Sequence, residues 1–127
     1  MNLETLIIVL LILFLHGIAD FVMQTDWEAK NKSVNNRALL SHTLTYSAIM
    51  AWIGIGWDIY MDHPYPLTGF YFGGITFIFH TLTDYFTSRL NTKLWKSGNT
   101  HNFFVVIEFD QLLHYVQLLL TFYFLTK

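Results

Sequence analysis

A histidine and an aspartate stand four residues apart at three places in this sequence: His16 and Asp20, His80 and Asp84, and Asp110 and His114. Residues with this spacing lie about one turn apart on the same face of an α-helix. Each pair offers an imidazole and a carboxylate, which can ligate a divalent cation, relay a proton or hydrogen-bond to each other. The chemistry available to the pairs depends on whether they stand alone or meet in one place.

All three pairs fall in segments that are apolar enough to lie within a lipid bilayer. Of the 127 residues, 54% are hydrophobic and 13% are charged, against roughly 45–50% and 25% in ordinary globular proteins. The apolar residues collect in four blocks, each close to the ~20 residues that a transmembrane helix needs. We therefore predict an all-α fold, in which residues 1–127 form a single transmembrane domain. It is an integral membrane four-helix bundle with helices at about 5–24, 38–57, 67–88 and 103–125.

The basic residues predict how this bundle is oriented. Six of the seven lysines and arginines lie in the first and third connections between the blocks, and residues 58–66 have none. Short loops rich in lysine and arginine stay in the cytoplasm. We therefore expect a multi-pass protein of the bacterial inner (cytoplasmic) membrane, with both termini outside and the basic loops inside. The three pairs and His42 then all lie within roughly 16 Å of the cytoplasmic ends of their helices. Residues from different helices have to lie in the same part of the membrane to form a shared site.

The first and third blocks share a local pattern. Residues 14–21 (FLHGIADF) and 78–85 (IFHTLTDY) are each followed by a basic loop and by a helix that bears a histidine. Two parallel hairpin repeats would pack about an axis along the membrane normal and bring the first and second pairs face to face. The pattern favours an interpretation of the bundle as two tandem helical hairpins.

Carboxylates inside a membrane must be protonated, paired with histidinium or bound to a cation. One aspartate at the centre of a membrane helix costs about 2.5 to 3.5 kcal/mol on insertion scales, and every lysine lies outside the blocks. With no cysteine in the chain, the candidate ligands for one or two zinc, manganese or iron ions are His16, Asp20, His42, His80, Asp84, Asp110 and His114. The alternative is that the pairs only hydrogen-bond and join helices, as polar residues of membrane helices often do.

Further motif residues flank the pairs. The motifs, which extend over nearly the whole chain, are His16-x-x-x-Asp20-Phe21-x-x-Gln24-Thr25-Asp26-Trp27 with Lys30, then Ser41-His42, His80-x-x-x-Asp84-Tyr85 and Asp110-Gln111-x-x-His114. They resemble the pattern of a family of small bacterial and phage-borne membrane proteins labelled domain of unknown function 3307 (DUF3307). The resemblance implies a four-span membrane protein and adds Gln24, Asp26, Lys30 and Gln111 to the candidate site. By helical spacing alone, however, Gln111 lies on a different face of its helix from Asp110 and His114.

From these residues we expect a metal-dependent hydrolase whose site opens at the cytoplasmic membrane face. The ions would polarise a phosphoryl or carbonyl group and generate hydroxide, with His42 as a ligand or general base. Lys30 and Arg89 would hold the anionic head group of a lipid-like or phosphorylated amphiphilic substrate. One alternative is an ion- or proton-translocating homo-oligomer that uses the same residues as a relay. Another is a non-enzymatic phage or bacterial membrane regulatory protein. The net charge of −2 argues against a nucleic-acid partner, and leaves the lipid bilayer as the expected environment.

Overall fold

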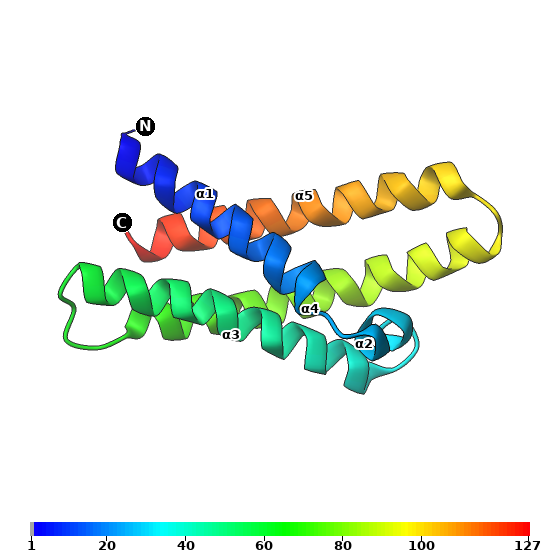
Figure 1. Ribbon diagram of the computed structural model, residues 1–127, viewed down its shortest axis with the longest axis horizontal. Coiled ribbons are helices and arrows are strands. Elements are labelled where there is room, and N and C mark those ends of the chain that lie inside the picture. Colours follow the sequence, from blue (N-terminus) through cyan, green and yellow to red (C-terminus); the bar gives the residue numbers. More distant parts are fainter. Residues whose placement is uncertain (1) are drawn as a thin grey trace.

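The computed structural model describes residues 2–127, within which 85% of the chain is helical and no strand is present. Five α-helices and one π-helical turn follow one another (Figure 1): α1 Leu3–Gly17, η1 Ile18–Val22, α2 Asp26–Asn31, α3 Asn36–Tyr60, α4 Leu67–Lys96 and α5 Thr100–Leu125. The prediction of an all-α fold is confirmed. The helix ends differ from the predicted ones by up to three residues, apart from two larger differences. The first connection contains α2, and the third predicted helix continues past residue 88 to Lys96.

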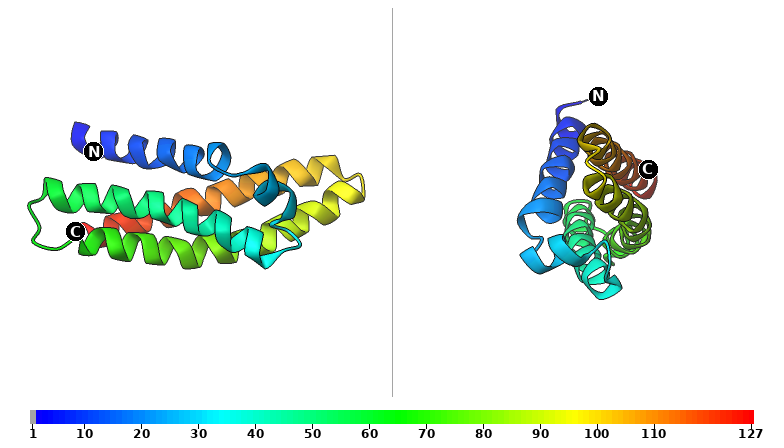
Figure 2. Two further views of the ribbon diagram at one scale, coloured as in Figure 1. Left: turned by 60° about the horizontal axis from the view of Figure 1, so that its bottom comes forward. Right: turned by 90° about the vertical axis from the view of Figure 1, so that its right-hand side faces the viewer.

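Four long helices surround one core. α1, α3, α4 and α5 gather around a common axis, with α2 beside the first turns of α3 (Figures 1 and 2). Both termini and the loop between α3 and α4 lie at one end of the molecule, and α2 and the turn between α4 and α5 lie at the other (Figure 1). The two basic connections are therefore at the same end.

Within residues 2–127, three segments are long and apolar enough to cross a membrane: Leu3–Val22, Asn36–Tyr60 and Thr100–Leu125. Many of their large apolar side chains are exposed, among them Leu10, Trp52 and Phe124, as expected where lipid covers a helix. α4 is long enough to cross a membrane, but its mean hydropathy is too low, because it contains threonines, glycines, His80 and Asp84. The chain is thus a membrane-type helical protein in which composition identifies three of the four predicted spans.

α3 and α4 approach each other closely at glycines. A Cβ atom on Gly54 would lie 2.6 Å from the Gly69 Cα, and one on Gly69 would lie 2.7 Å from the Ile55 nitrogen. Small residues allow membrane helices to pack at this distance. The buried Asp58 carboxylate accepts a hydrogen bond from the Gly69 N–H at 3.1 Å and contacts the His63 Nδ1 at 2.9 Å. This pair of helices is a tightly joined hairpin.

α1 changes to the π-helical turn η1 as it reaches the centre of the bundle. The Met23 N–H donates to the carbonyl of Ile18, five residues earlier, at 2.9 Å. A π turn holds one more residue than an α turn, so Asp20 does not keep the face that a regular helix would give it relative to His16. The two side chains therefore contact different atoms, His16 the oxygen and Asp20 the nitrogen of the Gln111 amide.

α2 is held against α3 by the buried carboxylate of Glu28. The Thr25 hydroxyl accepts from the Glu28 N–H at 3.2 Å, and the Thr25 N–H donates to Glu28 Oε2 at 2.9 Å. Glu28 Oε1 accepts from the Ser41 hydroxyl of α3 at 2.7 Å. Burial raises the pKa of Glu28, but these hydrogen bonds lower it by more, so its pKa lies below the usual glutamate value. The ionised carboxylate fixes α2 at the basic end of the bundle.

Candidate metal centre

The His/Asp pairs converge inside the bundle. We call this set the polar cluster; it contains Asp20 from η1, His42 from α3, His80 and Asp84 from α4, and Asp110 and His114 from α5. Five of these side chains are buried, and that of Asp110 is 14% exposed. Four elements of the chain thus bring six ionisable side chains into one place.

Four members of the polar cluster form a first candidate ligand group. Asp20, His42, His80 and Asp84 each offer a ligand atom within 4.8 Å of the others. The His42 Nε2 lies 3.0 Å from Asp20 Oδ1 and 3.2 Å from His80 Nε2. The same nitrogen lies 3.4 Å from Asp84 Oδ2. Ligand atoms of a tetrahedral ion with bonds of ~2.0 Å stand about 3.3 Å apart, so the donor types and their spacing fit a zinc-like ion.

A second candidate group shares Asp20 with the first. Asp20, Asp110 and His114 also offer one ligand atom each within 4.8 Å of one another. The Thr87 hydroxyl donates to Asp110 Oδ1. The Gln111 amide nitrogen donates to Asp20 Oδ2 at 2.9 Å and to Asp110 Oδ2 at 3.2 Å. The polar cluster therefore offers two candidate ion positions that have one carboxylate in common.

His16 lies beside the polar cluster and outside both ligand groups. Its Nε2 is 2.8 Å from Gln111 Oε1, and its Nδ1 contacts the Tyr46 hydroxyl. Because the Gln111 amide nitrogen donates to two carboxylates, the amide oxygen faces His16 and accepts a hydrogen from Nε2. In the neutral ring, Nδ1 then accepts from Tyr46. His16 is therefore not among the candidate ligands that the structure brings together, because the π-helical turn points His16 and Asp20 in different directions. Instead, His16 orients Asp20 through Gln111.

Gln111 and Tyr46 complete the arrangement. Gln111 belongs to the site, although helical spacing predicts that it faces away, because Asp20 of η1 accepts a hydrogen bond from it. The Tyr46 ring stacks on His80 with centroids 3.8 Å apart, and the His80 and His114 ring centroids are 4.1 Å apart. Tyr46 stands one turn after His42, so helical spacing already places it on the same face of α3.

Lys32 brings a positive charge to the polar cluster. It lies between α2 and α3, and its Nζ is 2.8 Å from Asp84 Oδ2, with 19% of the side chain exposed. Burial lowers the pKa of Lys32, but the Asp84 and Asp20 carboxylates raise it by more, so its pKa lies above the usual lysine value. Lys32 is therefore charged and neutralises one carboxylate. Sequence reasoning missed it because residues of a connection follow no helical period.

The remaining predicted residues surround the polar cluster without joining it. Lys30 and Asp26 are exposed on α2. Gln24 is half-buried and has an unpaired Oε1. Arg89, predicted to hold a head group, donates instead to the Asn36 side chain at 2.8 Å. Its guanidinium therefore ties α4 to the start of α3.

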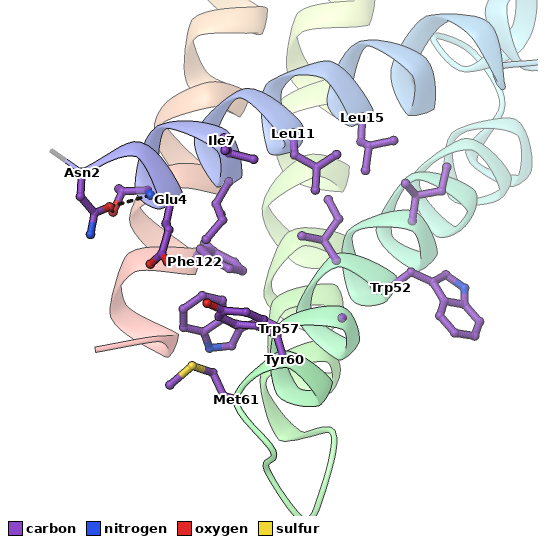
Figure 3. Close-up of a pocket in the computed structure, with 15 residues that line it drawn as sticks. Asn2, Glu4, Ile7, Leu11, Leu15, Trp52, Trp57, Tyr60, Met61 and Phe122 are labelled. Carbon is purple, nitrogen blue, oxygen red and sulfur yellow. Dashed lines mark hydrogen bonds between the residues drawn. The ribbon is translucent and has the colours of Figure 1, made fainter.

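Two hollows flank the core. The polar cavity, about 790 Å³ in volume, is bordered by η1, α2, α4 and α5 and is lined by Asp20, Asp84 and Asp110. A larger apolar cleft of about 1010 Å³ separates α1 from α3, and Figure 3 shows Leu11 and Trp57 on its two sides. The larger cleft has no histidine in its lining. The chemistry-bearing residues therefore border the smaller, polar cavity.

Comparison with known proteins identifies the family of the chain. The model of a family described as "Protein of unknown function (DUF3307)" matches residues 6–127, nearly the whole chain. No curated protein and no solved structure matches the chain significantly. Since the family description gives no activity, function has to be inferred from the polar cluster and its surroundings.

Proposed function

We propose that this chain, which belongs to the DUF3307 family, is a membrane-embedded, metal-dependent hydrolase. The observation that carries this proposal is the position of Asp20, which belongs to both candidate ligand groups. Metal-dependent phosphatases, nucleases and aminopeptidases often hold two ions about 3.5–4 Å apart. Zinc, manganese or iron would suit the nitrogen and oxygen ligands.

Each residue of the polar cluster has a task in this proposal. His42, His80 and Asp84 hold one ion, Asp110 and His114 hold the other, and Asp20 is shared. When bound, the ions would polarise a phosphoryl or carbonyl group and lower the pKa of a water molecule. Gln111 and His16 keep the Asp20 carboxylate oriented. Asp110, which borders the polar cavity and is the most exposed of the six, lies where a substrate would enter.

We place this centre in the cytoplasmic half of a four-span bundle. α3 and α5 both begin at the basic end of the bundle (Figure 1). If both cross the membrane, α4, which connects the end of α3 to the start of α5, has to cross it between them. The basic connections lie at the end of the bundle that the polar cavity faces, and basic loops favour the cytoplasmic side of a bacterial inner membrane. A substrate that reaches the cavity at this level would be lipid-like or a phosphorylated amphiphile.

Elemental analysis of the protein purified in a mild detergent tests the proposal. We expect one to two equivalents of zinc, manganese or iron. Asp20→Asn should lose both ions because it removes the shared carboxylate, whereas Glu108→Gln, an exposed carboxyl on the same bundle, should keep them. Less than about a tenth of an equivalent in the wild-type protein, with none restored by added metal, would refute the metalloenzyme.

Ion or proton translocation is a second candidate, favoured by a continuous hydrogen-bonded chain. Hydrogen bonds connect Tyr46 to His16, His16 to Gln111, and Gln111 to Asp20. Asp20 also contacts His42. Toward the opposite end of the bundle, however, the core is apolar and includes Met50, Phe72, Leu118 and Phe122. Proton flux in liposomes that Asp20→Asn abolishes would favour translocation, and no flux from a metal-loaded protein would favour the hydrolase.

A further inference from the structure

The polar cavity carries three lysines that the metal centre does not use as ligands. Lys30, Lys32 and Lys96 line it together with the three aspartates of the polar cluster. Lysine and aspartate charges therefore cancel along its lining. Two divalent ions would add four positive charges, so the loaded cavity would attract an anion.

The same lining contains hydrogen-bonding groups without partners. Gln24 Oε1, Ser88 Oγ and Asn91 Oδ1 are buried and unpaired, and all three residues border the polar cavity. Buried polar groups are nearly always paired in native proteins. Three of them at one cavity indicate that a polar ligand belongs there. The Ser88 hydroxyl can donate to a phosphate oxygen, and the two amide oxygens can accept from a hydroxyl group of the same ligand.

One wall of the polar cavity is aromatic. Trp95 at the end of α4 and Phe103 at the start of α5 lie with ring centroids 5.1 Å apart, and Phe104 follows in the same lining. This wall lies at the basic end of the bundle, where lipid head groups meet the chain in the proposed orientation. Trp and other aromatic side chains suit the boundary between head groups and hydrocarbon.

Lys32 lines the polar cavity and also contacts a candidate metal ligand. Its Nζ lies 2.8 Å from Asp84 Oδ2, and Asp84 also belongs to the first ligand group. An ion that binds Asp84 competes with the lysine for the carboxylate and repels its ammonium. The displaced side chain is already part of the cavity lining, and ammonium groups bind phosphate as point charges.

We propose that the polar cavity binds the phosphate group of an amphiphilic substrate, and that Lys32 moves from Asp84 to this phosphate when the metal ions bind. The inference rests on the proposed metal centre and names the substrate class for it. It also assigns the phosphate contact to Lys32 in place of Arg89, which is engaged with Asn36.

Titrations of the full-length protein in maltoside detergent test the exchange. Mn²⁺ is titrated first, and hexyl phosphate or inorganic phosphate is then titrated into metal-free and Mn²⁺-loaded protein. Lys32→Met should bind Mn²⁺ at least about threefold more tightly, because the competing cation is gone, and hexyl phosphate about tenfold more weakly. Lys32→Arg should restore the phosphate affinity. Lys93→Met is the matched control, since Lys93 is exposed at the same end of the bundle and lies outside the lining of the polar cavity, and should leave both affinities unchanged.

The opposite signs of the two effects separate this role from a structural one, because a variant that merely folds less well would lose both affinities. Failure of the wild-type protein to bind Mn²⁺, zinc or iron would overturn the metal centre and this inference with it. If metal binds but Lys32→Met shifts neither affinity, the inference alone is wrong. Equal affinity for hexyl and inorganic phosphate would overturn the amphiphilic substrate, and equal phosphate binding without metal would overturn the exchange.

Discussion

Gln111 offers a direct test of how the polar cluster is organised, because it touches no candidate ion position and yet holds the shared carboxylate. Its amide nitrogen donates to Asp20 and Asp110, and its oxygen accepts from His16. Gln111→Leu removes all three hydrogen bonds while keeping a side chain of similar size. Loss of a partner that orients a metal ligand weakens metal affinity by 10–100-fold in known sites, which corresponds to about 1.4 to 2.7 kcal/mol.

The assay is competition of the purified variant with a chelator of known metal affinity, with thermal unfolding measured in the same detergent. Gln117→Leu is the matched control. Gln117 lies on the same helix and donates to Thr76 and Thr121, away from every carboxylate. We expect both variants to unfold at a somewhat lower temperature, and only Gln111→Leu to bind metal more weakly. Wild-type metal affinity in Gln111→Leu would show that Asp20 needs no support from α5, and the proposed arrangement of the site would be wrong.

Two further predictions concern the framework. Gly69→Ala should destabilise the protein by about 1 to 3 kcal/mol through overpacking, since its Cβ would lie 2.7 Å from the Ile55 nitrogen, whereas Gly74→Ala, with nothing within 4 Å, should be neutral in thermal unfolding. The docking of α2 should weaken in acid. The pKa of Glu28 is lower in the folded protein than in the unfolded chain, so its contribution is present above the usual glutamate range and is lost as the pH falls through the folded pKa. The protection factors for hydrogen exchange of residues 26–31, which correct for the pH dependence of intrinsic exchange, should therefore fall on acidification. Glu28→Gln should already show lower protection at neutral pH, and its protection should respond little to acid.

Helical geometry explains why much of the polar cluster could be predicted from sequence. A rise of 1.5 Å per residue and an assigned direction for each helix place His42, His80, Asp84, Asp110 and His114 in the same half of the membrane, and the structure brings them together with Asp20. Such counting needs only regular helices whose ends are marked by polar connections. It fails at η1, where the π-helical turn changes the register and separates His16 from Asp20.

The connection before α3 was the other point at which the prediction was incomplete. The Thr25-x-x-Glu28 pattern is a capping box, which indicates the start of α2. The prediction treats this segment only as a polar connection between two helices. Lys32 has no comparable signal, because its approach to Asp84 depends on how α2 and its connection to α3 fold back over the bundle. Composition does not identify α4 as a membrane span, since His80, Asp84 and the other polar residues of this helix reduce its hydropathy.

The glycine-mediated contact between α3 and α4 also has a consequence for the order of assembly. Membrane helices generally insert before they associate, and the close approach at Gly54 and Gly69 makes this hairpin the natural first pair to form. The hairpin already carries His42, His80 and Asp84, three of the four ligands of the first group. Asp20 arrives only with α1, whose outer half stays separated from α3 by the apolar cleft. A bound ion would thus join the N-terminal helix to the hairpin of α3 and α4 at a late step of assembly. In cells starved of metal, α1 should therefore be the most protease-sensitive segment of the newly made protein.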